Sequence, residues 1–247
     1  MSNIVNPHRF AALSDEQKIE NGAVGGGVPY LWLDAGKLNG SDTTSGSDGD
    51  AISTWTSRSG SREFSQGTAS VQPTWQTGEI NSLPAVYFDG TEYMKTAAED
   101  MSFDEFSFFW VIKWSSSPNY AMFGHWVSRF WSIRHDRVLL SYDGANWAWQ
   151  THTSLATGSY EQDSYIKDDD EVFLRTNGSA VATLDWNNSS YNSINDISGS
   201  SSQLWIGAQG VSHRAKAYVS EAILWTSKIS DADRDTVESY LTTKYDL

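Results

Sequence analysis

The chain of 247 residues contains no cysteine. Disulfide bonds and metal sites built on thiolates are therefore excluded. The sequence also lacks any run of roughly eighteen apolar residues, the length of a helix that crosses a membrane. Its first ten residues, MSNIVNPHRF, have neither the basic start nor the long apolar segment of a secretory signal peptide, so we do not expect export by that route.

Sequence motifs for several classes of chemistry are missing as well. No glycine-rich phosphate loop is present, and no serine lies in a Gly-x-Ser-x-Gly elbow. The histidines are scattered and lack the His-x-x-x-His spacing of a zinc site: they are His8, His125, His135, His152 and His213. We therefore expect no nucleotide site, no serine-hydrolase triad and no histidine-based metal site.

Acidic residues outnumber basic ones, and the formal net charge is −14. This charge disfavours binding to DNA, RNA and anionic membrane surfaces, so we predict neither a nucleic-acid partner nor membrane insertion. Hydrophobic residues make up 39% of the chain and aromatic residues 13%, enough for a sizeable core. The length suits one all-β domain, and it would also suit two smaller domains.

The C-terminal segment predicts a strand followed by a helix. Residues 217–226 (AYVSEAILWT) are mostly apolar and aromatic, which is typical of a buried strand. Ser230 is a suitable N-cap, and the aspartates that follow it meet the positive end of the helix dipole. These aspartates are Asp231, Asp233 and Asp235, and the apolar stripe of the helix consists of Val237, Leu241 and Tyr245.

The N-terminal residues 1–27 differ from the rest of the chain. Ser14 and Gln17 have the spacing of a capping box at the start of a short helix, and residues 22–27 (GAVGGG) form a flexible joint. Four apolar residues favour a segment that makes contacts, with a frayed terminus as the alternative: they are Ile4, Val5, Phe10 and Leu13. We therefore predict an arm and linker over residues 1–27 and one domain over residues 28–247.

Short strands alternate with turn signals between these two ends. Residues 103–114 predict a long aromatic strand, and residues 203–208 (QLWIGA) predict another. Asp89-Gly90 and Asn177-Gly178 mark turns between strands. Glu161, Asp163 and the run Asp168–Glu171 are predicted to lie in a solvated polar loop. This pattern favours a sandwich of two antiparallel sheets.

Several of these segments carry a family resemblance. The strand PYLWLDA (29–35), the segment from Trp55 to Gly60, the run LPAVYFDGTEYM (83–94) and the ending from SEAILW to YLTTKYDL occur in this order. They resemble laminin-G-like jelly-roll domains of the concanavalin A-like lectin/glucanase superfamily, over about residues 29–247. The resemblance implies an all-β, two-sheet antiparallel jelly-roll sandwich with a C-terminal α-helix, preceded here by the extended arm. Because the superfamily includes lectins, hydrolases and structural domains, it implies no single function.

The first residues also bear on function. The opening NIVNPHRFA is similar to the starts of some tailed-phage particle proteins. Together with the arm, this predicts a non-catalytic structural protein of a viral particle, made in the host cytoplasm: a decoration, fibre or attachment component. The arm would anchor the protein to capsid or tail proteins. Its deletion should abolish incorporation into the particle and leave the domain folded. A homo-oligomer is compatible with this prediction. A free carbohydrate-binding module and a glycoside hydrolase or lyase are the alternatives.

Carboxylates decide between binding and hydrolysis. Hydrolases of the superfamily carry Glu-x-Asp-x-Glu on a strand, where alternate positions share one face. No predicted strand has this motif, and the three aspartates with suitable spacing lie at the predicted helix start. We therefore predict no catalytic residue.

Two binding sites are predicted. Asp42, Asp48 and Asp50 lie in a glycine-rich loop and could supply oxygen ligands to calcium, with a flexible loop as the alternative. Host-surface glycans would bind to aromatic faces with polar neighbours. The candidates lie near strand ends or in loops: they are Trp126, Tyr142, Asn146, Trp147 and Trp149. For each, a place in the core or in an inter-subunit contact is the alternative.

Overall fold

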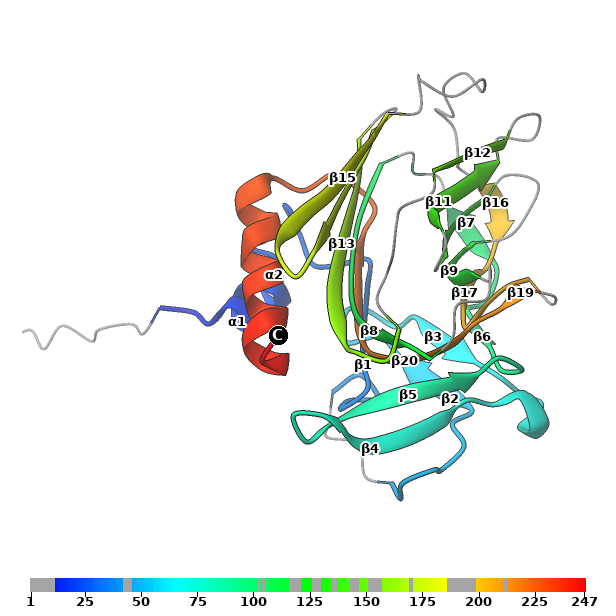
Figure 1. The fold of residues 1–247 in the computed structure, drawn as a ribbon. Coiled ribbons are helices and arrows are strands. Elements are labelled where there is room, and N and C mark those ends of the chain that lie inside the picture. The colour runs from blue at the N-terminus through cyan, green and yellow to red at the C-terminus, as the bar shows by residue number, and fades with distance from the viewer. Residues whose placement is uncertain are drawn as a thin grey trace, which may run out of the picture.

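The computed structural model describes residues 12–41, 46–101, 103, 105–115, 121–125, 130–134, 137–142, 147–150, 157–168, 171–185, 199–210 and 213–247. Two eight-stranded sheets, called A and B here, face each other, and helix α2 lies on the outer side of sheet A (Figure 1). All strand pairs within the sheets are antiparallel. The fold is a jelly-roll β-sandwich, as predicted.

Sheet A has the strand order β15-β14-β13-β8-β20-β5-β4, and β1 also pairs with β20. Its strands are β1 (Leu31–Asp34), β4 (Thr74–Ile80), β5 (Leu83–Asp89), β8 (Phe106–Trp114), β13 (Glu161–Asp168), β14 (Glu171–Thr176), β15 (Ser179–Asp185) and β20 (Lys216–Trp225). The predicted Asn177-Gly178 turn joins β14 to β15, and both of its residues have the positive φ that such a turn requires.

Sheet B has the strand order β12-β11-β10-β9-β17-β6-β3-β2. Its strands are β2 (Thr54–Thr56), β3 (Glu63–Ser65), β6 (Met94–Lys95), β9 (Ala121–His125), β10 (Phe130–Arg134), β11 (Arg137–Tyr142), β12 (Trp147–Gln150) and β17 (Leu204–Ile206). The remaining elements are the ribbons β7 (Glu99–Met101) with β16 (Gly199–Ser202) and β18 (Ala208–Gln209) with β19 (His213–Arg214), and a 3₁₀ turn, Ala69–Val71.

Strand β8 explains why sheet A forms the middle layer. Its residues Phe106, Phe108 and Trp110 belong to the core between the two sheets, whereas Phe109 and Val111 belong to a second core beneath the helices. A strand buried on both faces has a continuous apolar run rather than alternation. The sequence FSFFWVIKW is therefore the expected composition for this position.

Helix α2 (Asp231–Tyr245) forms where the sequence predicts it. The Ser230 hydroxyl accepts a hydrogen bond from the Asp233 amide at 3.1 Å, which caps the first turn. Val237, Leu241 and Tyr245 are buried against sheet A, as their spacing predicts. The aspartates at 231 and 233 occupy the first turn and face the helix dipole.

Helix α1 (Asp15–Glu20) has the predicted capping box of Ser14 and Gln17. Ile19 and Val24 are buried in the core beneath α2, and the Trp225 indole donates to the Gly27 carbonyl at 3.1 Å. Residues 14–27 therefore pack on the sandwich rather than extending from it. The boundary at residue 27 and the anchoring role stay predictions, the latter resting on residues 1–11, which are outside the described ranges.

Neither of the two helices found in the described ranges has the length and apolarity of a membrane span.

Candidate functional site

The outer face of sheet B carries a row of residues that crosses all eight strands. Trp131 and Ile133 belong to the core between the sheets, so Ser132 lies on the opposite, outer face. The strand register continues this position across the sheet as Trp149, Leu140, Ser132, Gly124, Trp205, Lys95, Ser65 and Thr54. Trp149 and Trp205 thus lie on either side of Leu140, Ser132 and Gly124 in this row.

A second, shorter row brings predicted sugar-binding residues together. Phe130 on β10 lies opposite Tyr142 on β11, which lies opposite Trp147 on β12. Neighbouring strands are about 4.8 Å apart, so three aromatic residues occupy adjacent positions. With Trp149 in the first row, three of the five predicted residues gather on the β11–β12 pair. Trp126 and Asn146 lie outside the described residues.

Tyr93, Trp205, Lys95 and Arg214 form a cluster at the other end of this face. The rings of Tyr93 and Trp205 are 5.1 Å apart, with 34° between their planes. The Lys95 ammonium lies 5.0 Å from the centre of the Trp205 ring, and the Arg214 guanidinium lies 5.1 Å from that of Tyr93. Each cation is therefore placed over an aromatic ring, where the ring quadrupole attracts it.

Two polar atoms in the first row have no hydrogen-bond partner among the residues that the structure describes. The indole N–H of Trp205 and the hydroxyl of Ser132 are buried without a hydrogen-bond partner. Gly124 separates them in the register, and a Cβ there would lie 2.2 Å from the Trp131 carbonyl oxygen. Buried polar groups in folded proteins are nearly always satisfied, so each unsatisfied one requires an explanation.

The sequence alone does not predict the cluster of Tyr93, Lys95, Trp205 and Arg214. Trp205 was placed on a predicted strand, and its position between the core residues Leu204 and Ile206 signals an outward orientation. Its neighbours Lys95 and Gly124 are 110 and 81 positions earlier in the chain. Only the strand order places them beside it.

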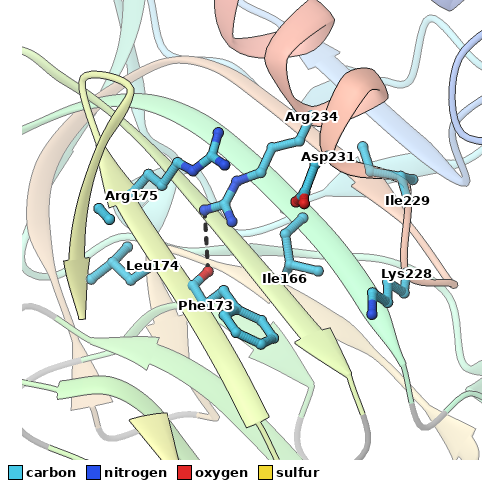
Figure 2. A pocket seen from close by; sticks show the side chains of 9 residues that line it. Ile166, Phe173, Leu174, Arg175, Lys228, Ile229, Asp231 and Arg234 are labelled. Carbon is cyan, nitrogen blue, oxygen red and sulfur yellow. Dashed lines mark hydrogen bonds between the residues drawn. The ribbon is translucent and has the colours of Figure 1, made fainter. Parts of the chain in front are cut away.

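A hollow of about 330 Å³ lies on the other side of the molecule, between α2 and the β14–β15 hairpin (Figure 2). Ile166, Phe173 and Ile229 contribute apolar surface to it. Arg175, Lys228 and Arg234 also line it, and Figure 2 shows the Arg234 guanidinium directed at the Phe173 carbonyl oxygen, 3.2 Å away.

The cations of this hollow are committed to internal ion pairs. Arg234 is buried and pairs with Glu238 at 3.0 Å. Arg175 pairs with Asp235 at 2.7 Å and with Glu238 at 3.3 Å, and Lys228 pairs with Asp168. These contacts hold the start of α2 on sheet A, so the hollow is a structural joint rather than a site for anions.

A second hollow, of about 490 Å³, lies near the C-terminal end of α2 and is lined by Trp75, Pro84 and Lys244 among others. Lys244 there donates to Asp34 at 2.8 Å and to Glu221 at 2.7 Å. Glu221 is fully buried and also accepts from three aromatic donors. They are Trp32 at 2.5 Å, Tyr240 at 2.8 Å and Tyr245 at 2.9 Å.

Burial, and then the charge of Glu221, raises the pKa of Tyr240 and of Tyr245 well above its usual value. Both phenols therefore remain protonated donors to the Glu221 carboxylate. Four donors on one carboxylate satisfy it fully, so this network stabilises the fold and has no capacity left for a substrate.

The prediction of a solvated polar loop is wrong for Glu161 and Asp163. Both lie on β13, with 4% and 0% of their surfaces exposed. Asp163 accepts from the Trp110 indole at 3.0 Å and from the Thr176 hydroxyl at 2.6 Å. Burial raises the pKa of Asp163 to about 6, against the effect of these bonds. Hydrogen-bond donors of the core thus allow Asp163 to be buried in a segment whose polar sequence is typical of a loop.

The other carboxylates of the predicted loop lie at strand ends. Asp168 closes β13 and pairs with Lys228, and Glu171 opens β14 with its side chain exposed. Residues 169 and 170 lie outside the described residues.

Two of the three predicted calcium ligands accept hydrogen bonds from nearby loop and strand residues. Asp48 accepts from the amide and hydroxyl of Thr77 at 2.7 and 3.1 Å, and Asp50 accepts from the Ser47 amide at 2.7 Å. Asp42 lies outside the described ranges. Within those ranges, no three histidine, aspartate or glutamate side chains gather as a metal site would require. Calcium binding stays a prediction.

No protein-family model matches the sequence, and no curated protein is similar to it. Similar solved structures are domain 4 of AbnA, a GH43 extracellular arabinanase from Geobacillus stearothermophilus in complex with arabinotriose, and the Botulinum neurotoxin serotype D ligand binding domain in complex with N-acetylneuraminic acid. The first has a TM-score of 0.53 and 14% identity, over 70% of this chain and 82% of that one. The second has a TM-score of 0.53 and 10% identity, over 92% of this chain and 53% of that one.

Trypanosoma rangeli sialidase in complex with sialic acid is similar too, with a TM-score of 0.51 and 10% identity. The match covers 87% of this chain and 33% of that one, so the chain spans about a third of the sialidase and about half of the neurotoxin chain. At these identities the similarity shows the fold alone. The predicted jelly-roll sandwich is confirmed, and the link to phage particles stays a prediction.

Proposed function

We propose that the chain is a non-catalytic glycan-binding module and that the outer face of sheet B is its binding face. The observation that carries this proposal is the in-register set of aromatic residues on adjacent strands. Phe130, Tyr142 and Trp147 follow one another across three strands, and Trp149 lies in the next row. Aromatic faces stack on the apolar faces of pyranose rings, and a flat sheet repeats such positions at regular spacing.

Three similar structures support the same proposal, because each is named with a sugar or a sugar-cleaving activity. They are an arabinanase domain with arabinotriose, a sialidase with sialic acid and a neurotoxin domain with N-acetylneuraminic acid. The group includes both enzymes and binding domains. The non-catalytic proposal therefore rests on this chain's own residues, whose buried carboxylates Glu221 and Asp163 bond to donors of the core.

A glycan array with the purified full-length chain, run with and without calcium, tests the proposal. We expect binding to the wild type and loss of most of it in Trp147→Ala and Trp149→Ala. Tyr87→Ala is the matched control, because Tyr87 is a partly exposed aromatic residue of sheet A stacked on Tyr218. A glycan bound equally by all four proteins would place the site elsewhere. Absence of binding by the wild type in both conditions would contradict the proposal, and dependence on calcium would support the predicted metal loop.

Sugar release separates the non-catalytic proposal from the hydrolase or lyase alternative. The proteins are incubated with the oligosaccharides that bind, and the products are separated by chromatography. We expect the oligosaccharides to stay intact, and reducing ends that accumulate with time would favour an enzyme.

We also propose that the module is displayed on a viral particle. Helix α1 lies on the helix-covered side of sheet A, on the opposite side of the molecule from sheet B (Figure 1), and Leu13 lines a hollow there with Tyr240 and Lys244 of α2. An anchor that precedes residue 12 would thus leave sheet B directed away from its attachment point. Mass spectrometry of purified particles tests this proposal: we expect the chain in them at a fixed copy number, and its absence would favour a free lectin-like module.

A further inference from the structure

In the part of the chain that the structure describes, Lys95 and Arg214 have no carboxylate partner, although the protein is strongly acidic. The net charge is −14, and the buried guanidinium groups of Arg58 and Arg234 are paired with Asp34 at 3.2 Å and with Glu238 at 3.0 Å. Lys95 reaches only the Gln203 amide oxygen at 3.4 Å, and Arg214 donates to the Thr91 carbonyl. Within the described ranges, no acidic side chain pairs with either of them.

The acidic side chains nearest in sequence to this cluster are engaged in their own turn. Glu92 accepts from the Asp89 amide at 2.9 Å, and Asp89 accepts from the amide and hydroxyl of Thr91, both at 2.7 Å. These bonds shape the turn after β5 that brings Tyr93 onto the outer face of sheet B. The turn therefore uses its carboxylates locally, and neither Asp89 nor Glu92 bonds to Lys95 or Arg214 in the described structure.

The aromatic pair beside these cations is suited to a ring-shaped ligand. Tyr93 is partly exposed and packs on Trp205, whose indole N–H is buried without an acceptor. Trp205 is in the same cross-strand row as Trp149.

We propose that Tyr93, Lys95, Trp205 and Arg214 form a subsite for an acidic sugar residue. Arg214 and Lys95 would hold the acid group, because a charge-assisted hydrogen bond is stronger than the contact of a cation with a ring. The ring of the sugar would pack against the exposed part of Tyr93. The acid group is a carboxylate or a sulfate ester, since both accept paired N–H donors. This inference rests on the proposed glycan-binding function of the same face.

The test uses the full-length chain and matched oligosaccharides in neutral, carboxylated and sulfated forms. Titration calorimetry at low and at raised salt measures each affinity. We expect an acidic form to bind at least about tenfold more tightly than the neutral one, a difference that salt reduces. The carboxylated and sulfated arms show which acid group the subsite prefers.

A double variant, Lys95→Gln with Arg214→Gln, should lose this preference and still bind the neutral form. Lys216→Gln is the matched control: Lys216 is a partly exposed lysine of sheet A on β20, for which the described residues provide no ion pair. Thermal melts confirm that each variant is folded. Equal affinity for neutral and acidic forms, or a preference that survives the double substitution, would overturn the subsite alone. Failure of the wild type to bind any form would overturn both the subsite and the proposed function.

Discussion

Glu92 illustrates how a single carboxyl group can make the stability of this fold depend on pH. It follows the Asp89-Gly90 turn, has 8% of its surface exposed and accepts a hydrogen bond from the Asp89 amide. Burial raises its pKa to about 7, and the charge of Asp89 adds to this effect while the amide bond opposes it. The folded state therefore binds this proton more tightly than the unfolded chain, in which the pKa is near 4.5.

The sign of the pH effect follows from this raised pKa. Stabilisation by the protonated carboxyl is complete below the unfolded pKa of 4.5 and is lost as pH rises through about 7. We expect the free energy of unfolding to fall by about 1–2 kcal/mol over this range because of Glu92. In Glu92→Gln the amide oxygen can still accept the Asp89 N–H, but the titration is gone. Urea denaturation at pH 5 and pH 8 should therefore give a smaller difference for the variant.

Glu63→Gln is the control for this prediction, because Glu63 is exposed on β3. It removes the same charge without removing a buried titration, so its difference between pH 5 and pH 8 should match that of the wild type. Other groups, Asp163 among them, titrate in both proteins and cancel in the comparison. A Glu92→Gln profile parallel to the wild type would contradict the prediction.

At the scale of elements, helix α2 is held on sheet A by one buried carboxylate near its end. Glu221 on β20 accepts from Tyr240, Lys244 and Tyr245, all on α2. The sequence analysis placed the helix and its apolar stripe correctly. It could not identify Glu221 as the anchor, because that role depends on where β20 lies beneath the helix.

Replacing Glu221 by alanine should lower the free energy of unfolding by about 3–5 kcal/mol, since the buried donors of Trp32, Tyr240 and Tyr245 lose their acceptor and the half-buried Lys244 keeps only Asp34 as a carboxylate partner. Urea denaturation followed by circular dichroism measures this change. Ser239→Ala is the control, because Ser239 is exposed on the same helix. A Glu221→Ala loss no larger than that of Ser239→Ala would show that the network does not hold the helix.

Buried strands can be recognised from the sequence when they are apolar, but not when they are polar. Strands β8 and β20 are recognisable because their apolar runs are long and buried on both sides. Strand β13 (EQDSYIKD) is not, because donors from other strands satisfy the buried carboxylate of Asp163: they are Trp110 and Thr176. Hydrogen bonds between residues far apart in sequence leave no local pattern.

At the scale of the whole molecule, the candidate face depends on strand order. The sequence alone predicts Tyr142, Trp147 and Trp149 as candidates, because they lie close together near one hairpin. It missed Tyr93 and Trp205, because strand β17 reaches its place between β9 and β6 only through the jelly-roll topology. The alternation of residues within a strand is local, whereas the identity of its neighbours is a property of the complete sheet.

The N-terminal segment gives the final prediction. The sequence analysis expects removal of residues 1–27 to leave the domain folded, but the structure places Ile19 and Val24 in the core beneath α2. Arg58 also pairs with Glu16 at 2.7 Å and with Glu20. A chain that begins at residue 28 loses these contacts and exposes the apolar surface that they cover.

We therefore expect the free energy of unfolding of a chain that starts at residue 28 to be about 2–5 kcal/mol lower than that of a chain that starts at residue 12. The chain starting at residue 12 is the reference, because the difference then belongs to residues 12–27 alone. Urea denaturation gives both free energies, and incorporation into particles is scored for the same two proteins. If the arm anchors the module through residues 1–11, neither protein is incorporated into particles. Because the protein that starts at residue 12 retains the α1 contacts, its failure cannot be caused by their loss. Equal stability of the two proteins would show that α1 is a separate arm after all.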